Sequence, residues 1–530
     1  MKITSIIALF LLFNLNIFAK LICPVIPLPN QVEKNNNVFT LNYNTVLTVN
    51  NESLEQLANY LQKEIHVRYN KSIPITKKER YYNINLRLNK HKKKDVPIIG
   101  AYNLSVTEKE IVIESNNSEG IFNGIQTLLQ LINSGKKTGN IVEIEGWEIV
   151  DTPLYQWRGF MLDESRHFFG TKKVKQILDW MAYYKLNKFH WHLTDQHGWR
   201  IDIKNYPKLS RIGGIGNYHD ELAKAKYYTQ QEILEIVNYA KDRFIEIIPE
   251  IDMPGHASAA NKAYPEYSGG GSKSHPEYTF NPGKDSVYTY LTNILREVDV
   301  LFPSQKIHIG GDEVHYGNER WSDLVDVKQL MKREKLKDLK EVENYFFKRI
   351  ADSLLRLDNK ILAWDEVANA DVPANETILF WWRHNRPEQL KIALARGMAI
   401  VMCPRYPMYF DYMQDSLQVY GPDYKKFTLN SVENVYKFSQ DNYGIEIPKI
   451  NNILGIQANL WTERIRTENR LDYMLFPRLA ALAESAWTAK NNKDFISFSD
   501  RIKKDFILYE KNGIYYFNYQ DRKKTGEPKY

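Results

Sequence analysis

The sequence predicts an α/β protein in which a (β/α)8 TIM barrel follows a smaller α+β domain. Two observations predict this arrangement. From about residue 157 to residue 487, short apolar segments alternate with amphipathic ones roughly eight times, which is typical of a parallel barrel surrounded by helices. No glycine-rich fingerprint follows the first strand, which argues against the alternative of an open, doubly wound sheet.

The N-terminal residues 1–19 are typical of a signal peptide. Lys2 is followed by an apolar run from Ile6 to Phe13, and Ala19 provides a small residue before a cleavage point. The run is too short for a stable membrane span. We therefore expect an exported protein, located in the periplasm, at the cell surface or outside the cell.

Residues 20–152 read as the α+β domain, because β-branched segments alternate with two amphipathic ones. The strand candidates are Val38–Leu41, Val46–Val49, Ile84–Leu88, Leu104–Val106 and Ile111–Glu114, and the helix candidates are Ser53–Tyr69 and Ile121–Ile132.

Residues 153–490 read as the barrel, and residues 491–530 as a C-terminal extension. The eight expected strands are Arg158–Asp163, Lys188–Leu193, Phe244–Ile251, Lys306–Gly310, Ile361–Trp364, Ile378–Trp382, Met398–Met402 and Leu454–Trp461. The helices expected between and after them are Thr171–Leu186, Thr229–Arg243, Asp285–Val300, Val342–Leu357, Glu388–Arg396 and Asp472–Trp487.

Composition excludes several classes of protein. The chain of 530 residues has 43% hydrophobic and 25% charged residues, the balance of a folded globular protein. Its net charge of +7 is too small for this length to indicate nucleic-acid binding. Two distant cysteines, Cys23 and Cys403, build neither a disulfide framework nor a cysteine-rich zinc site. The oligomeric state stays open, with a homodimer as one alternative.

Polar side chains gather where the expected barrel strands end, which is where TIM barrels carry their active sites. The sharpest feature is the adjacent pair Asp312 and Glu313 after two glycines. Two inward-facing carboxylates repel, so one of them tends to hold a proton, as general acid catalysis requires. The alternative is an acidic helix N-cap, which the other strand ends make less attractive.

Three tryptophans at strand ends, Trp364, Trp382 and Trp461, indicate a sugar site. The C–H faces of a pyranose pack on aromatic rings, while carboxylates and Arg166 bind hydroxyl groups. Core packing explains a single such tryptophan, and a structural ion pair would explain the arginine. Three rings beside carboxylates favour the sugar.

His190 and His192 support a rival hypothesis. Their spacing places both on one face of a strand, as metal ligands can be. A metal-dependent TIM-barrel hydrolase would use them with His256 and His308. Since no later strand end offers a clean further ligand set, we prefer packing or supporting roles for this pair. His256 is interpreted as a partner of a catalytic carboxylate, with Asp195 behind it.

Several motifs together resemble the β-N-acetylhexosaminidases of glycoside hydrolase family 20. The motifs are His308-Ile-Gly-Gly-Asp312-Glu313, Leu162-Asp163-Glu-Ser-Arg166-His167-Phe168, His190-Trp-His-Leu-Thr-Asp195, Asp252-Met-Pro-Gly-His256 and Leu460-Trp461-Thr-Glu463. The resemblance extends from Pro27 to about Trp487 and implies the same two-domain fold.

The resemblance also implies a mechanism in which the substrate's own 2-acetamido oxygen attacks C1 and forms an oxazolinium intermediate. Glu313 then corresponds to the general acid and base. Asp312 corresponds to the group that holds the acetamido N–H and stabilises the positive charge. The implied enzyme is exo-acting and retaining, and neither a cofactor nor a metal is expected.

The remaining site residues are carried over in the same way. Tyr409 matches the tyrosine that binds the acetamido oxygen, and Trp364, Trp382 and Trp461 match the walls of the sugar pocket. Arg166, Asp411 and Glu463 match the groups on the outer hydroxyls, and Asp195 and His256 match a pair that supports the acid. The implied partner is a glycan or chitooligosaccharide ending in β-linked N-acetylglucosamine or N-acetylgalactosamine.

The sequence does not decide between these two sugars, nor does it give the linkage. A sugar-binding protein without activity is the third alternative. Retention of Asp312, Glu313, Tyr409 and Arg166 together argues against it, because binding alone does not require the acid.

Overall fold

The computed structural model describes residues 23–89, 98–420, 429–443 and 452–529. The expected signal peptide, 1–19, lies outside the described residues. Among the helices that are described, none combines the length and the apolar character needed to cross a membrane.

The N-terminal part of the chain forms a mixed sheet with helices on one face. Strand order is β1-β7-β4-β5-β3-β2, with β6 paired to β7. The strands are β1 (Gln31–Leu41), β2 (Val46–Val49), β3 (Asn83–Leu88), β4 (Tyr102–Val106), β5 (Glu110–Ser115), β6 (Lys136–Thr138) and β7 (Ile141–Asp151). The helices are α1 (Glu55–Tyr69) and α2 (Ser118–Ser134).

Eight parallel strands form a closed barrel, as predicted. In chain order they are β8 (Trp157–Asp163), β9 (Lys188–His192), β12 (Glu246–Glu250), β15 (Lys306–His308), β16 (Lys360–Trp364), β17 (Thr377–Trp381), β18 (Ala399–Met402) and β19 (Ile453–Leu460). Each strand pairs with the next, and β19 closes the barrel on β8. All eight lie within three residues of their expected bounds.

Helices surround the barrel. The longer ones are α3 (Thr171–Tyr183), α5 (Gln230–Lys241), α7 (Asp285–Leu301), α8 (Val325–Glu334), α9 (Leu339–Leu355), α10 (Pro387–Ala395), α13 (Glu468–Leu475), α14 (Arg478–Trp487) and α15 (Phe495–Lys511). The shorter ones are α4 (Lys208–Arg211), α6 (Ser258–Ala263), α11 (Arg405–Met408) and α12 (Val432–Tyr436). Two small hairpins, β10 (Thr194–Asp195) with β11 (Gly198–Trp199) and β13 (Ser268–Gly270) with β14 (Thr279–Phe280), lie in the loops.

One expected helix is divided. The segment Asp472–Trp487 was expected to be continuous, but α13 ends at Leu475 and α14 begins at Arg478. Pro477 has no N–H to donate and disfavours a helical conformation at Phe476, whose backbone is extended (ψ 134°). The apolar spacing on both sides of the proline gave no sign of this break.

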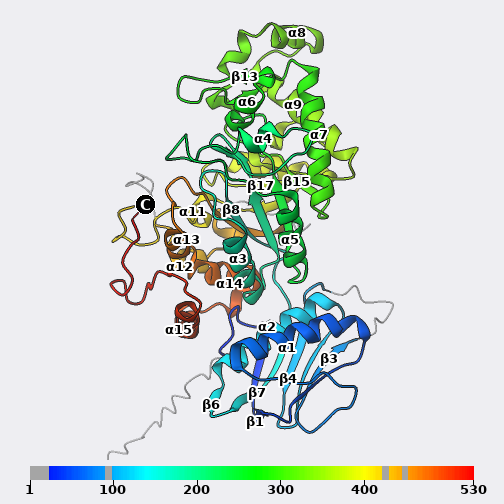
Figure 1. Ribbon diagram of the computed structural model, residues 1–530, viewed down its shortest axis with the longest axis vertical. Coiled ribbons are helices and arrows are strands. Elements are labelled where there is room, and N and C mark those ends of the chain that lie inside the picture. The colour runs from blue at the N-terminus through cyan, green and yellow to red at the C-terminus, as the bar shows by residue number, and fades with distance from the viewer. Residues whose placement is uncertain (1–22, 90–97, 421–428, 444–451, 530) are drawn as a thin grey trace, which may run out of the picture.

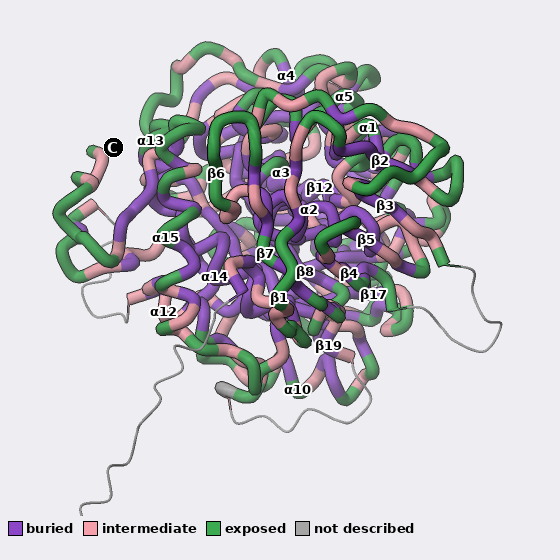
Figure 2. The backbone as a smooth tube through the Cα atoms, turned by 90° about the horizontal axis from the view of Figure 1, so that it is seen from below, coloured by how far each residue is buried: buried purple, intermediate pink, exposed green. Residues whose placement is uncertain are grey.

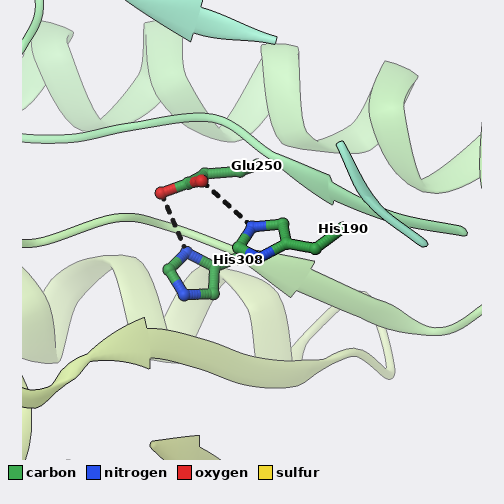
Figure 3. Close-up of side chains that lie close together, drawn as sticks. All are labelled: His190, Glu250 and His308. Carbon is green, nitrogen blue, oxygen red and sulfur yellow. Dashed lines mark ion pairs between the residues drawn. The ribbon is translucent and has the colours of Figure 1, made fainter. Parts of the chain in front are cut away.

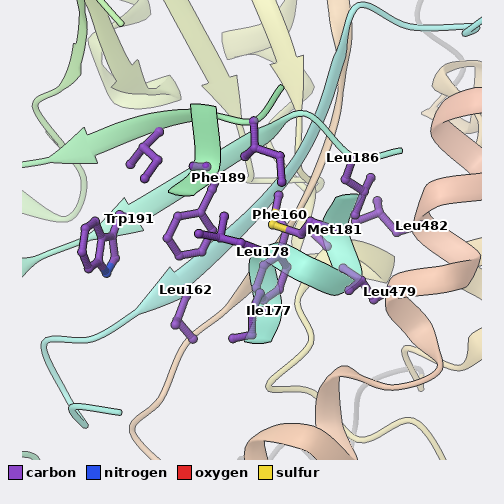
Figure 4. Packing of buried hydrophobic residues seen from close by; sticks show 14 of the residues in the cluster. Phe160, Leu162, Ile177, Leu178, Met181, Leu186, Phe189, Trp191, Leu479 and Leu482 are labelled. Carbon is purple, nitrogen blue, oxygen red and sulfur yellow. The ribbon is translucent and has the colours of Figure 1, made fainter. Parts of the chain in front are cut away.

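The core lies between the barrel strands and the helices outside them. Phe160 on β8 and Phe189 on β9 pack against Ile177, Leu178 and Met181 on α3 (Figure 4). In the view of the burial-coloured tube, the buried residues run through the interior and the exposed ones lie at the rim (Figure 2). The barrel is therefore a filled core, and sites in this fold lie at the carboxyl ends of the strands.

Helix α2 lies between the N-terminal sheet and the barrel (Figure 1). Its residues from Gly120 to Ile132 are all buried. The rings of Phe122 on α2 and Phe244 before β12 have centroids 5.3 Å apart, and the Gln130 amide donates to the carbonyl of Tyr183 at 3.1 Å. Because this contact is at the opposite end of the strands from the site, the N-terminal unit supports the barrel from below.

Candidate active site

A cavity of about 460 Å³ opens at the carboxyl ends of the barrel strands. It is lined by Arg166, Gln196, His197, Tyr218, His256, His275, Tyr278, Asp312, Glu313, Tyr316, Trp382, Arg405, Tyr409, Asp411, Tyr412, Trp461, Glu463 and Arg464. These residues follow β8, β9, β12, β15, β17, β18 and β19, so one closed barrel brings together side chains from across more than half of the chain.

The backbone after β15 turns sharply to present the carboxylate pair. Gly310 and Gly311 have φ values of 66° and 92°, and Glu313 itself has a φ of 53°. A Cβ atom on Gly310 would lie 1.8 Å from Oδ1 of Asp252. Glycine is therefore required here both by conformation and by space. A left-handed glutamate is uncommon and marks a position that the surrounding structure holds in place.

Asp312 is buried and Glu313 is about one-third exposed. Burial raises the pKa of Asp312 to about 6, with the nearby carboxylates of Glu313, Glu250 and Asp195 adding to the effect and His256 opposing it. Asp312 is thus ionised at neutral pH but protonates in mild acid.

His256 links the carboxylate pair to Asp195. Its Nδ1 lies 3.0 Å from Asp195 Oδ1, and its Nε2 lies 3.7 Å from Asp312 Oδ2 and 3.8 Å from Glu313 Oε2. Burial disfavours the charged imidazole, but Asp195 and Asp312 outweigh it and raise the pKa of His256 to about 9. His256 therefore places a positive charge beside both acids at neutral pH.

Aromatic rings form one wall of the cavity. Trp382 and Tyr409 are stacked, with ring centroids 6.3 Å apart and an interplanar angle of 14°, and Trp461 lies 6.2 Å from Tyr409. Trp382 donates from Nε1 to Glu366 at 3.0 Å, which fixes the ring. This wall offers apolar faces of the kind that pack against sugar C–H groups.

Charged groups occupy the part of the cavity near β8 and β19. Nη2 of Arg166 lies 2.8 Å from Asp195 Oδ2 and 3.6 Å from Glu463 Oε1. Burial, together with the charge of Glu463, raises the pKa of Asp411 well above its usual range. A guanidinium and two carboxyl groups in this position can donate to and accept from several hydroxyl groups.

Nine of the eleven predicted site residues line the cavity, and two lie beneath it. Asp195 is buried under Arg166 and His256 and contacts both. Trp364 is 1% exposed, and its Nε1 donates to Glu250 Oε1 at 2.9 Å. Its ring lies 5.9 Å from that of Trp461, so it supports the aromatic wall from behind.

Sequence reasoning missed several residues around the cavity. Glu250 is the last residue of the third strand, Asp252 lies just after that strand, and Glu366 lies just after the fifth, so the rule that placed Asp312 could have found them. Tyr278 and Tyr316 come from loops that carry no periodic pattern, and no signal in the sequence indicated them.

The structure accounts for the predicted histidine pair without a metal. His192 places its two ring nitrogens on Glu250 and Asp195, and His190 contacts Gln457 through Nδ1 and Glu250 through Nε2. Ligand atoms of His190, Glu250 and His308 lie within 4.8 Å of one another. Glu250 is also hydrogen-bonded to His192 and Trp364, so both of its oxygens already have protein partners.

Comparison with known proteins agrees with this geometry. Residues 155–490 match the catalytic domain of glycosyl hydrolase family 20, and residues 23–152 match domain 2 of the same family. The chain is 33% identical over 518 residues to a protein named beta-hexosaminidase from Porphyromonas gingivalis, covering 93% of this chain and 64% of that protein.

Two solved structures are similar over nearly the whole chain. An exo β-N-acetylglucosaminidase from Vibrio harveyi, solved with N-acetylglucosamine, is 31% identical with a TM-score of 0.84, covering 94% of this chain and 78% of that one. A β-N-acetylhexosaminidase from Bacteroides fragilis is 30% identical with a TM-score of 0.82, and the match covers 95% of this chain and 99% of that one. The match of both family domains and the eight-stranded barrel confirm the predicted resemblance: this chain belongs to glycosyl hydrolase family 20.

Proposed function

We propose that this protein is an exo-acting, retaining β-N-acetylhexosaminidase that removes one terminal N-acetylhexosamine at a time from glycans or chitooligosaccharides. The observation that carries the proposal is the single cavity lined both by Asp312 and Glu313 and by the neighbouring rings of Trp382, Tyr409 and Trp461. A cavity of about 460 Å³ lies within the range of small-ligand pockets, about 300–1,000 Å³, and suits a terminal sugar.

The two acids have different tasks in this proposal. Glu313 gives its proton to the glycosidic oxygen as the bond from C1 to that oxygen breaks. The acetamido carbonyl oxygen of the substrate forms the new bond to C1, which gives an oxazolinium ion. Glu313, now a carboxylate, takes a proton from water as that water attacks C1 and the bond from C1 to the amide oxygen breaks. This regenerates the acetamido group and restores the β-configuration.

Asp312 acts on the acetamido group. As a carboxylate it accepts a hydrogen bond from the acetamido N–H and stabilises the positive charge that spreads over the oxazolinium ring. Its raised pKa of about 6 favours this task at neutral pH, because the buried anion lacks solvation until the cationic ring forms beside it. Tyr409 is assigned as the donor to the acetamido oxygen, and the aromatic wall is assigned to shield the ring from water.

The opposite end of the cavity selects the terminal sugar. Arg166, Asp411 and Glu463 are assigned to its outer hydroxyl groups. Three charged groups gathered in one part of the cavity can bind several hydroxyl groups of a single terminal sugar, which supports attack at chain ends rather than within a chain.

We also propose that the protein acts after export, because residues 1–19 are typical of a signal peptide. Mass spectrometry of the protein recovered from the extracytoplasmic fraction tests this. A mature N-terminus at Lys20 is expected, whereas a retained Met1 would contradict it.

The activity is tested with 4-nitrophenyl glycosides. We expect release of nitrophenol from the β-N-acetylglucosaminide or the β-N-acetylgalactosaminide, and their ratio gives the sugar preference. The plain β-glucoside should react at least a thousandfold more slowly, since it lacks the attacking group. Equal rates on acetamido and plain glycosides would overturn the proposal. Activity lost with a chelator and restored by zinc would favour the metal-dependent alternative.

A further inference from the structure

His192 lies between two carboxylates below the cavity. Its Nδ1 is 2.5 Å from Glu250 Oε2, and its Nε2 is 2.9 Å from Asp195 Oδ2. All three side chains are buried. A carboxylate oxygen accepts hydrogen bonds, so an imidazole between two carboxylates donates from both nitrogens and carries a positive charge.

The charge on His192 has a physical cause that His190 lacks. Burial disfavours the imidazolium form of both residues, yet Glu250 and Asp195 together raise the pKa of His192 to about 10. Burial dominates at His190 and lowers its pKa to about 4, and Gln457 contacts its Nδ1 at 3.0 Å. Two histidines on one face of β9 therefore differ in charge at neutral pH.

Asp195 receives three positive charges. His192 and Arg166 bind its Oδ2, and Nδ1 of His256 binds its Oδ1. These groups hold its pKa well below the usual range in spite of burial. Charges thus alternate along one buried path from the negative Glu250 through His192, Asp195 and His256 to the acidic pair.

Glu250 is the fixed end of this path. Figure 3 shows its two oxygens directed at His190 and His308. One oxygen also binds His192, and the other accepts from Trp364 behind the aromatic wall. The hydrogen bonds with His192 at Oε2 and Trp364 at Oε1 engage both oxygens of Glu250 and so fix its orientation relative to His192.

We propose that Glu250 and His192 are positioning residues that hold Asp195 ionised and aimed at His256, and thereby set the pH range in which the Asp312–Glu313 pair works. The inference rests on the proposed function. The proton that reaches the leaving oxygen still comes from Glu313, and no proton moves along the path. The effect of Glu250 and His192 is to keep the positive His256 within 4 Å of both acids.

The groups that face the path come from several elements. Arg166 and its partner Asp163 face Asp195 from the end of β8. Asp252 lies after the end of β12, and burial together with the charges of Asp312, Glu250 and Asp195 raises the pKa of Asp252 well above its usual range. Tyr278 packs against the His256 ring, and Trp461 packs edge-on against His192. With all of these unchanged, loss of the positive His192 makes the surroundings of Asp312 and Glu313 more negative, which raises the pKa of a carboxylic acid.

The test compares variants of the full-length protein on the aryl β-N-acetylhexosaminide over pH 4–9. His192→Phe removes both contacts. We expect kcat to fall about 10- to 100-fold, as for other partners that orient a functional imidazole, with KM changed less than threefold. In the pH profile of kcat/KM, the midpoint of the acidic limb should shift to a higher pH by roughly half a unit. His192→Gln keeps an N–H near Asp195 and should recover part of kcat, but not the position of the limb.

His190→Gln is the matched control, because His190 is equally buried on the same strand and touches Glu250 but has no contact with Asp195. It should lower the melting temperature while leaving the pH limb in place. A limb that stays in place in His192→Phe, or that moves equally in His190→Gln, would overturn the inference. If His192→Phe does not fold, His192→Gln carries the test, because it also removes the positive charge and its limb should be displaced in the same direction. Failure of the proposed function itself would show as an inactive wild type.

Discussion

The surroundings of Asp312 disfavour an ionised carboxylate. It is 8% exposed, next to Glu313 in the chain and close to Glu250, Asp252 and Asp195. His256 supplies the nearest positive charge. This arrangement suits a group that must stabilise a cation formed during the reaction, because the charge that completes the site arrives only with the intermediate.

Replacing Asp312 by Asn should stabilise the folded protein above pH 6. The pKa of Asp312 is about 6 in the folded protein and 3.8 in its unperturbed state. The folded state therefore binds the proton more tightly, and its relative stability falls as pH rises through this interval. A difference of about two pH units corresponds to roughly 3 kcal/mol.

The measurement is the free energy of unfolding in urea at pH 8 and pH 4. The free energy of unfolding of Asp312→Asn should exceed that of the wild type at pH 8, and the difference between the two should disappear at pH 4. The variant should also lose most of its activity, as expected for a residue whose ionised form stabilises the intermediate. A variant less stable than the wild type at pH 8 would contradict the assigned electrostatics.

Replacing Glu313 by Gln should affect substrates according to their leaving groups. An alkyl or sugar leaving group needs protonation, so the rate on a disaccharide should fall about 10²- to 10⁴-fold. A dinitrophenyl group leaves without a proton, and its release should be much less affected. The dependence of kcat/KM on leaving-group pKa measures this. A uniform loss would instead assign the acid role elsewhere, and a reversed dependence would exchange the roles of the two acids.

At the scale of elements, the turn after β15 decides the position of both acids. Gly310 is in the left-handed region and lies against Asp252, whose Oδ1 also accepts from the N–H of Gly311 at 3.3 Å. The turn is therefore specified by contact as well as by backbone freedom.

Gly310→Ala should abolish most activity, because its Cβ cannot occupy the same space as Asp252 and the turn must shift. Gly397→Ala is the control, since its φ of 77° is also left-handed but nothing lies within 4 Å of the added Cβ. The control should lose only about 1 kcal/mol of stability and keep wild-type kcat. Loss of activity in both variants to the same degree would show that strain alone, and not the contact with Asp252, is responsible.

Elements with a strong local pattern could be predicted from the sequence. All eight barrel strands were predicted, because buried parallel strands are short apolar runs between amphipathic helices. The short helices and hairpins of the loops could not be, since tertiary contacts decide them. The break at Pro477 shows the reverse case, where one residue overrides a regular apolar spacing.

The site residues also divide into those that a local sequence pattern predicts and those that tertiary contacts decide. Residues directly at strand ends, such as Asp312, Arg166 and Trp461, were predicted, because barrel geometry brings these positions together. The support beneath them was not predicted in detail. That Trp364 lies behind the wall, and that Glu250 joins it to His192, depends on side-chain directions inside the barrel.

At the scale of the whole molecule, the C-terminal helix α15 ties the barrel to the start of the described chain. Arg501 on α15 forms a bidentate ion pair with Glu484 on α14 at 2.6 and 2.7 Å, and also donates to the carbonyl of Val25 at 2.8 Å. Both charged side chains are buried. The contact between Arg501 and Val25 therefore joins segments more than 450 residues apart in the sequence.

Arg501→Met should destabilise the protein by about 3–5 kcal/mol, because it leaves the Glu484 carboxylate buried without its partner. Lys503→Met removes a cation from the same helix whose ion pair with Asp500 is largely exposed, and it should change stability by less than about 1 kcal/mol. Urea unfolding gives both values. Since neither residue of the pair lines the cavity, kcat of the folded Arg501→Met protein should stay within twofold of the wild type. A large fall would indicate coupling between the helix and the site.

The participation of the substrate's amide is tested most directly by weakening that amide in steps. Aryl glycosides with N-acetyl, N-fluoroacetyl, N-difluoroacetyl and N-trifluoroacetyl groups differ little in shape, but their carbonyl oxygens become progressively poorer nucleophiles. If the amide oxygen attacks C1, kcat/KM should fall steeply and linearly on a logarithmic scale along the series. A rate that does not depend on fluorination would mean that an enzyme group or water attacks C1, and the roles assigned to Asp312 and Tyr409 would be wrong.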